Sequence, residues 1–279
     1  MGKDGPMLSG LPQARTFVIP PLLELRGTTV FGQKVCYYEL GAGPPLILIH
    51  GLGGDADEWI FCLTELSCSN RVVIIDLPGF GRSDKPMIRY SIDGFVEVLE
   101  RFLNALAIER ASLVGSSLGG WVAAAFALKF AERTERLVLI DAAGMQLEAP
   151  ELPIDLRVST HRHMRDVLRM MFYDQSFVTE ELIDLAYAGH LRRQDGYTIG
   201  SVLENFKDKG EWLDDRIAEL KVPTLILWGE EDAMIPVCIS DIFHRLIKGS
   251  IREIIPLCGH LPALERPAEV IRHVANFVR

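Results

Sequence analysis

Residues 112–120 read SLVGSSLGG, and this stretch decides how the rest of the chain is interpreted. It begins with a short apolar run and leads into an alanine-rich segment that can form a helix. The pattern Gly-x-Ser-x-Gly at a strand-to-helix junction is typical of a nucleophile elbow, because small residues permit a turn so tight that the serine side chain stands above the sheet. A loop that only caps a helix is the alternative, since serine is a favoured N-cap. The motif makes Ser117 a candidate nucleophile.

A serine hydroxyl is a weak nucleophile until a base accepts its proton and a third group holds that base. Asp232 comes shortly after a later apolar run, and His260 comes after the next strand-like segment. Since parallel strands bring their carboxyl ends to one edge of a sheet, these residues can meet there. We therefore predict a catalytic triad of Ser117, Asp232 and His260, in the chain order Ser, Asp, His. Asp141 also ends an apolar run and is the second candidate for the carboxylate.

Attack on a carbonyl group places negative charge on its oxygen, and preorganised donors must receive that charge. Residues 50–54 read HGLGG and follow an apolar run. We expect the backbone N–H groups of Leu52 and of Leu118, the residue after the nucleophile, to form this oxyanion hole. His50 opens the glycine-rich turn, where we expect it to form hydrogen bonds within the loop.

Short apolar runs recur along the chain, separated by segments long enough for helices. Continuous apolar strands of this kind indicate a parallel sheet that is covered on both faces. Residues 92–106 and 267–278 repeat their apolar positions with the period of a helix. Residues 23–40 instead suggest two antiparallel strands at one edge. The pattern predicts an α/β fold whose parallel strands include the apolar runs at residues 46–49, 72–75, 112–114, 137–140 and 224–228.

The alternation stops between residues 144 and 214, where Met, Phe, Tyr and Leu are spread at helical spacing. We interpret residues 144–214 as a helical insertion between two strands. The core would then consist of residues 1–143 and 215–279, and residues 1–16 would form a short tail at its start. A chain of 279 residues is long enough for one large domain with such an insertion.

Composition excludes several kinds of partner. The formal net charge of −9 disfavours nucleic acid and anionic membrane surfaces. No apolar run approaches the roughly 18 residues of a membrane span, so we expect a soluble protein. Five cysteines without CxxC spacing suggest neither a disulfide framework nor a zinc site, and reduced thiols fit the cytoplasm. No His pair has HExxH spacing. We expect no cofactor and no metal, and the oligomeric state stays open.

Five segments together resemble the α/β-hydrolase family: 50–54, 76–83, 115–120, 228–232 and 258–260. The match extends from about residue 23 to the C-terminus. The resemblance implies a mostly parallel sheet of eight strands with helices on both faces, and a cap formed by the helical insertion over the active site. It also implies a structural role for Asp76 and Arg82, which would tie a loop near the site.

Within this family, residues 172–176, 179–182 and 258–260 resemble the meta-cleavage-product hydrolases, which cut carbon–carbon bonds in dienoates. That group usually has asparagine before the nucleophile, tryptophan after the histidine and an arginine in the cap. This chain departs from the group at all three positions, with Ser116, Leu261 and Ala186.

Without an arginine at the position of Ala186, the dienoate carboxylate lacks its expected partner. Arg192 and Arg193 are substitutes by position, but we expect them to have surface roles. The sequence therefore favours a serine carboxylesterase that acts through an acyl-enzyme intermediate, with carbon–carbon bond hydrolysis as the alternative. Because the cap is apolar and rich in flexible Met side chains, we expect short to medium-chain, uncharged esters as substrates.

Two other classes of function are compatible with parts of the sequence. Residues 51–56 match the dinucleotide fingerprint G-x-G-x-x-G/A, and Asp76 ends the next strand, as in an NAD-dependent oxidoreductase. That fingerprint normally follows the first strand of its domain, whereas two strands precede it here. A ligand-sensing protein with the hydrolase fold is also conceivable, since a fold does not fix a function. The complete triad favours turnover.

Overall fold

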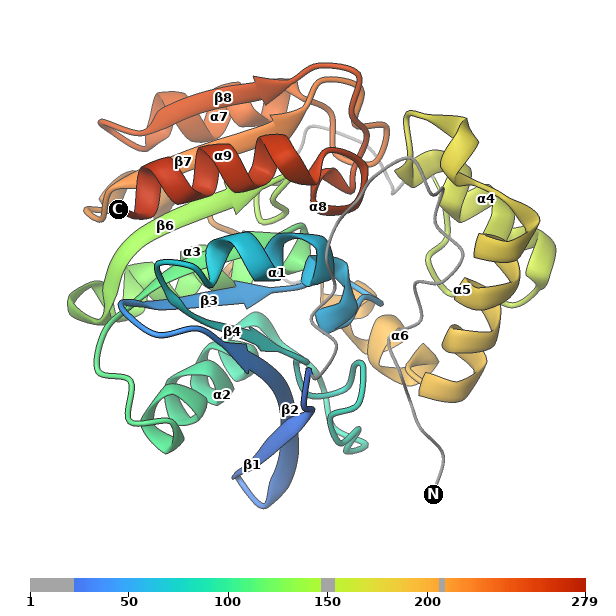
Figure 1. The fold of residues 1–279 in the computed structure, drawn as a ribbon, viewed down its shortest axis with the longest axis horizontal. Helices are drawn as coiled ribbons and strands as arrows, with labels where there is room; N and C mark the ends of the chain where they lie inside the picture. Colours follow the sequence, from blue (N-terminus) through green and yellow to red (C-terminus); the bar gives the residue numbers. More distant parts are fainter. Residues whose placement is uncertain (1–22, 147–153, 206–208) are drawn as a thin grey trace.

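The computed structural model describes residues 23–146, 154–205 and 209–279, and within them eight strands form one sheet (Figure 1). The strands are β1 (Arg26–Val30), β2 (Gln33–Leu40), β3 (Pro45–Ile49), β4 (Arg71–Ile75), β5 (Ala111–Ser116), β6 (Thr134–Ile140), β7 (Thr224–Gly229) and β8 (Ile251–Ile255). Their order is β1-β2-β4-β3-β5-β6-β7-β8. β2 is antiparallel to both of its neighbours, and the remaining pairs are parallel.

This architecture confirms the predicted fold class. All five predicted apolar runs lie in parallel strands of the sheet, and the predicted antiparallel pair in residues 23–40 is β1 and β2 at one edge. The two predicted helices are α2 (Ile92–Ala105) and α9 (Pro267–Val278), and Pro267 is the first residue of α9, where its missing N–H costs no hydrogen bond. The predicted tail at residues 1–16 lies outside the described residues.

The sheet is buried on both faces, and alternate residues of β3 face opposite sides. Four more helices belong to this part of the chain: α1 (Ile60–Leu66), α3 (Leu118–Lys129), α7 (Cys238–Leu246) and α8 (Pro262–Glu265). Ile47 and Ile49 pack in one apolar cluster with α2, α3 and α7, whereas Leu46 and Leu48 pack in another with α1 and α9. All four side chains are fully buried, and each contributes about 1.5–3 kcal/mol of hydrophobic stabilisation.

The helices of the insertion lie beyond the carboxyl ends of the strands, apart from the helices that cover the sheet (Figure 1). They are α4 (His161–Met171), α5 (Glu180–Arg193) and α6 (Gly196–Asn205). Thr160 and Thr179 cap α4 and α5, because each side chain accepts a hydrogen bond from a first-turn N–H. One apolar cluster holds α4 and α5 together: Met164, Leu168, Phe172, Phe177 and Ile183.

Five short 3-10 helices connect these elements: η1 (Ala56–Trp59), η2 (Ala131–Arg133), η3 (Gln175–Phe177), η4 (Lys209–Glu211) and η5 (Ile217–Glu219). Among the described residues, no helix combines the length and the apolar character needed to cross a lipid bilayer. Parts of the predicted insertion, residues 147–153 and 206–208, lie outside the described residues.

Candidate active site

Ser117 occupies the sharp turn between β5 and α3. Its φ is 51° and its ψ is −117°, a left-handed conformation that is rare for a residue with a side chain. The turn is possible because glycines flank it. A Cβ on Gly115 would collide with the carbonyl of Gly119, and a Cβ on Gly119 would collide with the carbonyl of Ile49. The N–H of Ser117 donates to the carbonyl of Ile140 over 3.0 Å, so the strained residue is anchored to β6.

Asp232 and His260 are in direct contact. The distance between Nδ1 of His260 and Oδ2 of Asp232 is 2.8 Å. The other carboxylate oxygen of Asp232 accepts the N–H groups of Met234, at 2.8 Å, and Ile235, at 2.9 Å. The N–H of His260 donates to the carbonyl of Met171 at the end of α4, also over 2.8 Å. With Nδ1 committed to Asp232, Nε2 of the imidazole is left to act as a base.

Asp232 also changes the acidity of His260. Burial lowers the pKa of the imidazole, but the negative charge and the hydrogen bond of Asp232, together with the charge of Glu58, outweigh burial and raise the pKa above its ordinary 6.5. The side chain of His260 is only 5% exposed, so solvent screens this interaction little. A neutral imidazole is therefore the main form only at a pH higher than for a free histidine.

This raised pKa predicts how activity depends on pH. Because His260 must be neutral to accept a proton, kcat/KM should fall as the pH drops, with a midpoint above the value of about 6.5 of a free histidine. Rates measured from about pH 5 to 9 would locate the midpoint. A profile that is flat down to about pH 5 would exclude a histidine base.

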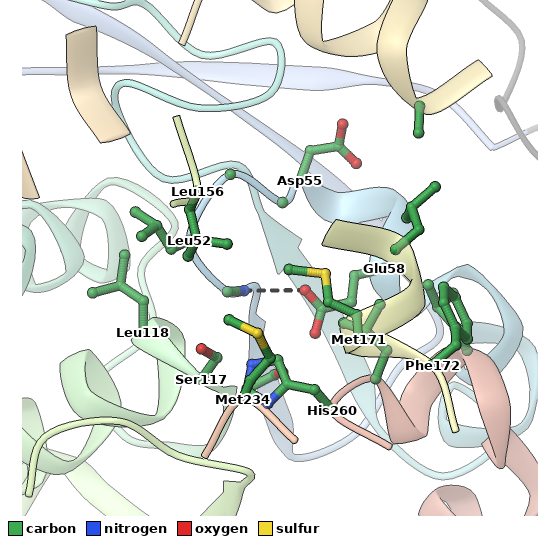
Figure 2. Close-up of a pocket in the computed structure, with 18 of the residues that line it drawn as sticks. Leu52, Asp55, Glu58, Ser117, Leu118, Leu156, Met171, Phe172, Met234 and His260 are labelled. Atoms are coloured by element: carbon green, nitrogen blue, oxygen red, sulfur yellow. Dashed lines mark hydrogen bonds between the residues drawn. The ribbon is translucent and has the colours of Figure 1, made fainter. Parts of the chain in front are cut away.

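Ser117 and His260 line one pocket with a volume of about 250 Å³, and Leu52 and Leu118 form part of its wall. In the view of Figure 2, the hydroxyl of Ser117 lies between Leu118 and the imidazole of His260. Leu118 opens α3, where the first N–H groups of a helix have no partner within the helix. A Cβ on Gly51 would lie 3.1 Å from Cβ of Ser117, so the loop with Leu52 passes directly beside the candidate nucleophile. Both predicted oxyanion donors thus border this pocket.

The sequence-predicted neighbours of the site are buried and bonded. Nδ1 of His50 lies 2.7 Å from the carbonyl oxygen of Gly51, and its Nε2 accepts the N–H of Leu77 over 3.0 Å. His50 thus has a hydrogen-bonding role, as expected. Asp76 accepts N–H groups from Ala56 and Arg82, at 2.6 and 2.7 Å, and ties two loops together.

Sequence reasoning did not single out Glu58, which lies in η1 and lines the pocket. Its Oε2 accepts the N–H of Gly51 over 3.0 Å, the hydrogen bond drawn in Figure 2. Burial raises the pKa of this carboxyl, and the hydrogen bond from Gly51 opposes the change. The sequence shows only that Glu58 directly precedes a tryptophan. The structure adds that this tryptophan, Trp59, is fully buried. Glu58 therefore holds in place the loop that contains Leu52, the predicted oxyanion donor.

The expected surface role is wrong for Arg193. This last residue of α5 lines the pocket, and its side chain is only 17% exposed. The guanidinium forms ion pairs with Asp55, at 3.1 Å, and with Asp195, at 3.2 Å. Arg192 is exposed, as expected. Ala186 lines the same pocket without a charge, so at this wall of the pocket a guanidinium comes from Arg193 and not from the position where the dienoate hydrolases usually have an arginine.

Within the described part of the chain, one group of His, Cys and acidic side chains is compact enough to hold a metal ion: Asp141, Asp232 and His260, with candidate ligand atoms within 4.8 Å of one another. Nδ1 of His260 is already bonded to Asp232, so the contact is that of a base and its orienting carboxylate. The loop at residues 51–56 follows β3, the third strand along the described chain, whereas a dinucleotide fingerprint normally follows the first strand of its domain.

A tight strand-to-helix turn at Ser117 that shares a pocket with His260, itself bonded to Asp232, is the arrangement expected of a serine hydrolase with an α/β fold. A model of the alpha/beta hydrolase family matches residues 46–273. The chain is 32% identical over 266 residues to the 2-hydroxy-6-oxo-2,4-heptadienoate hydrolase of Pseudomonas putida, which covers 88% of this chain and 93% of that protein. This chain belongs to the α/β-hydrolase family.

Solved structures of related proteins share the fold. A membrane phospholipase A described as a bacterial virulence factor superimposes with a TM-score of 0.84 at 29% identity, covering 92% of this chain and 86% of that one. A meta-cleavage product hydrolase of Pseudomonas fluorescens superimposes with a TM-score of 0.82 at 30% identity, covering 91% and 97%. The named relatives thus include carbon–carbon bond hydrolases and a lipid ester hydrolase, and the curated relatives favour the carbon–carbon alternative over the ester preference drawn from the sequence.

Proposed function

We propose that this protein hydrolyses a carbon–carbon bond next to a ketone, in small substrates of the 2-hydroxy-6-oxodienoate kind named for its relatives. The observation that supports this most is the 32% identity to a dienoate hydrolase over nearly the whole chain, combined with a site in which Asp232 orients His260. Ser117 is the nucleophile of the proposal. No step requires a metal or a cofactor.

The proposed reaction begins when Nε2 of His260 accepts the proton of Ser117 and the serine oxygen bonds to the ketone carbon. The N–H groups of Leu52 and Leu118 receive the negative charge on the carbonyl oxygen. The dienoate reacts as its 2-oxo tautomer, which forms when the 2-hydroxyl loses its proton and the carbon next to the ketone gains one. When the tetrahedral adduct collapses, the carbon–carbon bond therefore breaks with its electron pair delocalised through the remaining double bond onto the 2-oxo group. His260 returns its proton to that carbon fragment. A water molecule, deprotonated by His260, then releases the acyl group from Ser117.

Arg193 is our candidate for binding the substrate carboxylate. It is a pocket-lining cation at the cap, and a guanidinium can bind a carboxylate through two parallel hydrogen bonds. Its present partners are carboxylates of the protein, Asp55 and Asp195. In this proposal the substrate carboxylate takes the place of Asp55, whereas Asp195 continues to hold the guanidinium.

Ester hydrolysis is the second candidate, because the pocket is mainly apolar where the dienoate hydrolases would present an arginine. Ala186, Leu261 and Leu182 line this region. A membrane phospholipase A among the structural relatives supports the same candidate. An enzyme of this kind would prefer short to medium-chain, uncharged esters, and each extra buried methylene would contribute up to about 0.8 kcal/mol.

One substrate comparison separates the two candidates. We expect kcat/KM for a 6-oxodienoate to exceed that for the best ester of an acetyl to dodecanoyl p-nitrophenyl series by about tenfold or more, a difference of roughly 1.4 kcal/mol. If the ester is the better substrate by that margin, the carbon–carbon proposal is wrong and the esterase candidate replaces it.

The role of Arg193 predicts a selective defect. Arg193→Gln should raise KM for the dienoate by about 10- to 100-fold, because a charge-assisted contact contributes roughly 1.5–3 kcal/mol. For an uncharged ester, kcat/KM should stay within about threefold of wild type. Arg192→Gln is the matched control, since it removes the neighbouring, exposed charge. An equal loss on both substrates would mean that Arg193 only holds the cap to the core.

Two broader proposals accompany this function. We propose that residues 144–214 act as a cap, which is supported by the pocket residues that α4 and α5 contribute, among them Leu168 and Leu182. We also propose a cytoplasmic location, which the five free thiols support.

A further inference from the structure

Asp141 is a buried acid that the reaction proposed above does not use. It follows β6 directly, has a φ of 44° and is fully buried. Its Oδ1 accepts the N–H of Gly229 over 2.9 Å. Its Oδ2 is shielded from solvent and has no hydrogen-bond donor among the described residues. Such an oxygen is costly to bury as part of a charged carboxylate.

A second carboxylate lies beside it. Candidate ligand atoms of Asp141, Asp232 and His260 all lie within 4.8 Å of one another. The other titratable groups that face Asp141 are Glu58, whose charge would add to the repulsion, and the thiol of Cys258. Two buried carboxylates at this separation do not both ionise, so the pair holds a proton.

The hydrogen bonds decide which of the two carboxyls holds that proton. Asp232 is surrounded by three donors, namely the N–H groups of Met234 and Ile235 and Nδ1 of His260. Asp141 has one. Since donors stabilise the ionised form, the negative charge belongs on Asp232. Burial and the charge of Asp232 raise the pKa of Asp141 well above its ordinary range.

We propose that Asp141 is a neutral carboxylic acid whose Oδ2 donates a hydrogen bond to the Asp232 carboxylate, which makes Asp141 a positioning residue for the Asp232–His260 pair. The mechanistic part of this proposal rests on the proposed function. The hydrogen bond fixes the orientation of Asp232. It also keeps Asp141 from adding a second carboxylate charge to the Asp232–His260 pair, a charge that would hold the imidazole more strongly in its protonated form at neutral pH.

Asp141→Asn is the sharpest test, because the amide imitates the protonated acid. Its oxygen can accept the N–H of Gly229 and its NH₂ can donate to Asp232, without a change of charge. In the unfolded chain Asp141 ionises near about pH 3.9. Above that pH the folded wild type must retain a proton that the unfolded chain releases, and stability is lost. The variant is free of this loss.

We therefore expect the Tm of Asp141→Asn to exceed that of wild type by at least about 2 °C at pH 7, since one unit of raised pKa corresponds to roughly 2–4 °C in a protein of this size. The gain should disappear at about pH 4. A variant that is less stable than wild type at pH 7 would show that Asp141 is ionised in the folded protein, and would overturn the proposal. This comparison needs no substrate, so it shows whether Asp141 is protonated in the folded protein even if the proposed function is wrong.

The pH dependence of kcat/KM tests the positioning role. For Asp141→Asn we expect an acidic limb within about 0.3 pH units of wild type, because no charge is removed near His260. Asp141→Ala should lower kcat/KM by about tenfold, because Asp232 then loses the one donor that Asp141 supplies, and Asp141→Asn should retain the activity that the alanine variant loses. A downward displacement of the limb by about one unit in Asp141→Asn would mean that a negative charge was lost, and would overturn the proposal.

Discussion

Ser117→Ala is expected to lower kcat by about a millionfold, on dienoates and esters alike, as loss of the nucleophile does in serine hydrolases. The hydroxyl of Ser117 is the one group proposed to form the acyl-enzyme. Alanine removes a single oxygen and leaves the backbone turn with its φ of 51° as it is. The Tm should therefore stay close to that of wild type, and a single-turnover assay at high enzyme concentration would measure the residual rate.

Ser116→Ala provides the matched control. Ser116 is the preceding residue in the same elbow, it lines the same pocket, and it is almost fully buried. We expect it to retain kcat within about tenfold of wild type, because its hydroxyl takes no part in bond making. An organophosphonate should label Ser117 in wild type and no serine in Ser117→Ala. A label on another serine, together with an active Ser117→Ala variant, would refute the assignment.

The sheet could be predicted because strands buried on both faces must be apolar without interruption. Residues 46–49 and 137–140 meet this condition and lie in β3 and β6. The ends of strands were harder to predict. β5 continues past its apolar run to Ser116, because Gly115 and Ser116 still pair with Ile49 and Ile140. Backbone hydrogen bonds between strands do not require apolar side chains, so the pattern of apolar residues does not show where a strand ends.

The pocket residues that α4 and α5 contribute could not be predicted from local patterns in the sequence. Arg193 ends a helix, where a basic residue is favourable for the helix dipole and usually faces solvent. Its ion pair with Asp55 joins residues that are 138 positions apart in the chain. That contact depends on how α5 packs against the loop that contains Asp55. The spacing of residues along the sequence does not predict such tertiary packing.

The choice between Asp141 and Asp232 illustrates the same limit at the site itself. Both residues follow parallel strands, so both reach the same edge of the sheet, and the sequence leaves either able to orient a histidine. The order of the strands favours Asp232 in this structure. His260 follows β8, β8 pairs with β7, and Asp232 follows β7, whereas Asp141 follows β6, one strand further away.

Asp232→Asn should therefore lower kcat by about ten-thousandfold, because the amide favours the imidazole tautomer that cannot accept the serine proton. The amide oxygen can keep the N–H groups of Met234 and Ile235, so the loop should stay folded. Without the charge that raises the pKa of His260, the acidic limb of the remaining activity should move to lower pH. Asp141→Asn under the same conditions is the comparison. If Asp141→Asn loses about ten-thousandfold and Asp232→Asn stays within about tenfold of wild type, then Asp141 is the carboxylate that orients the base.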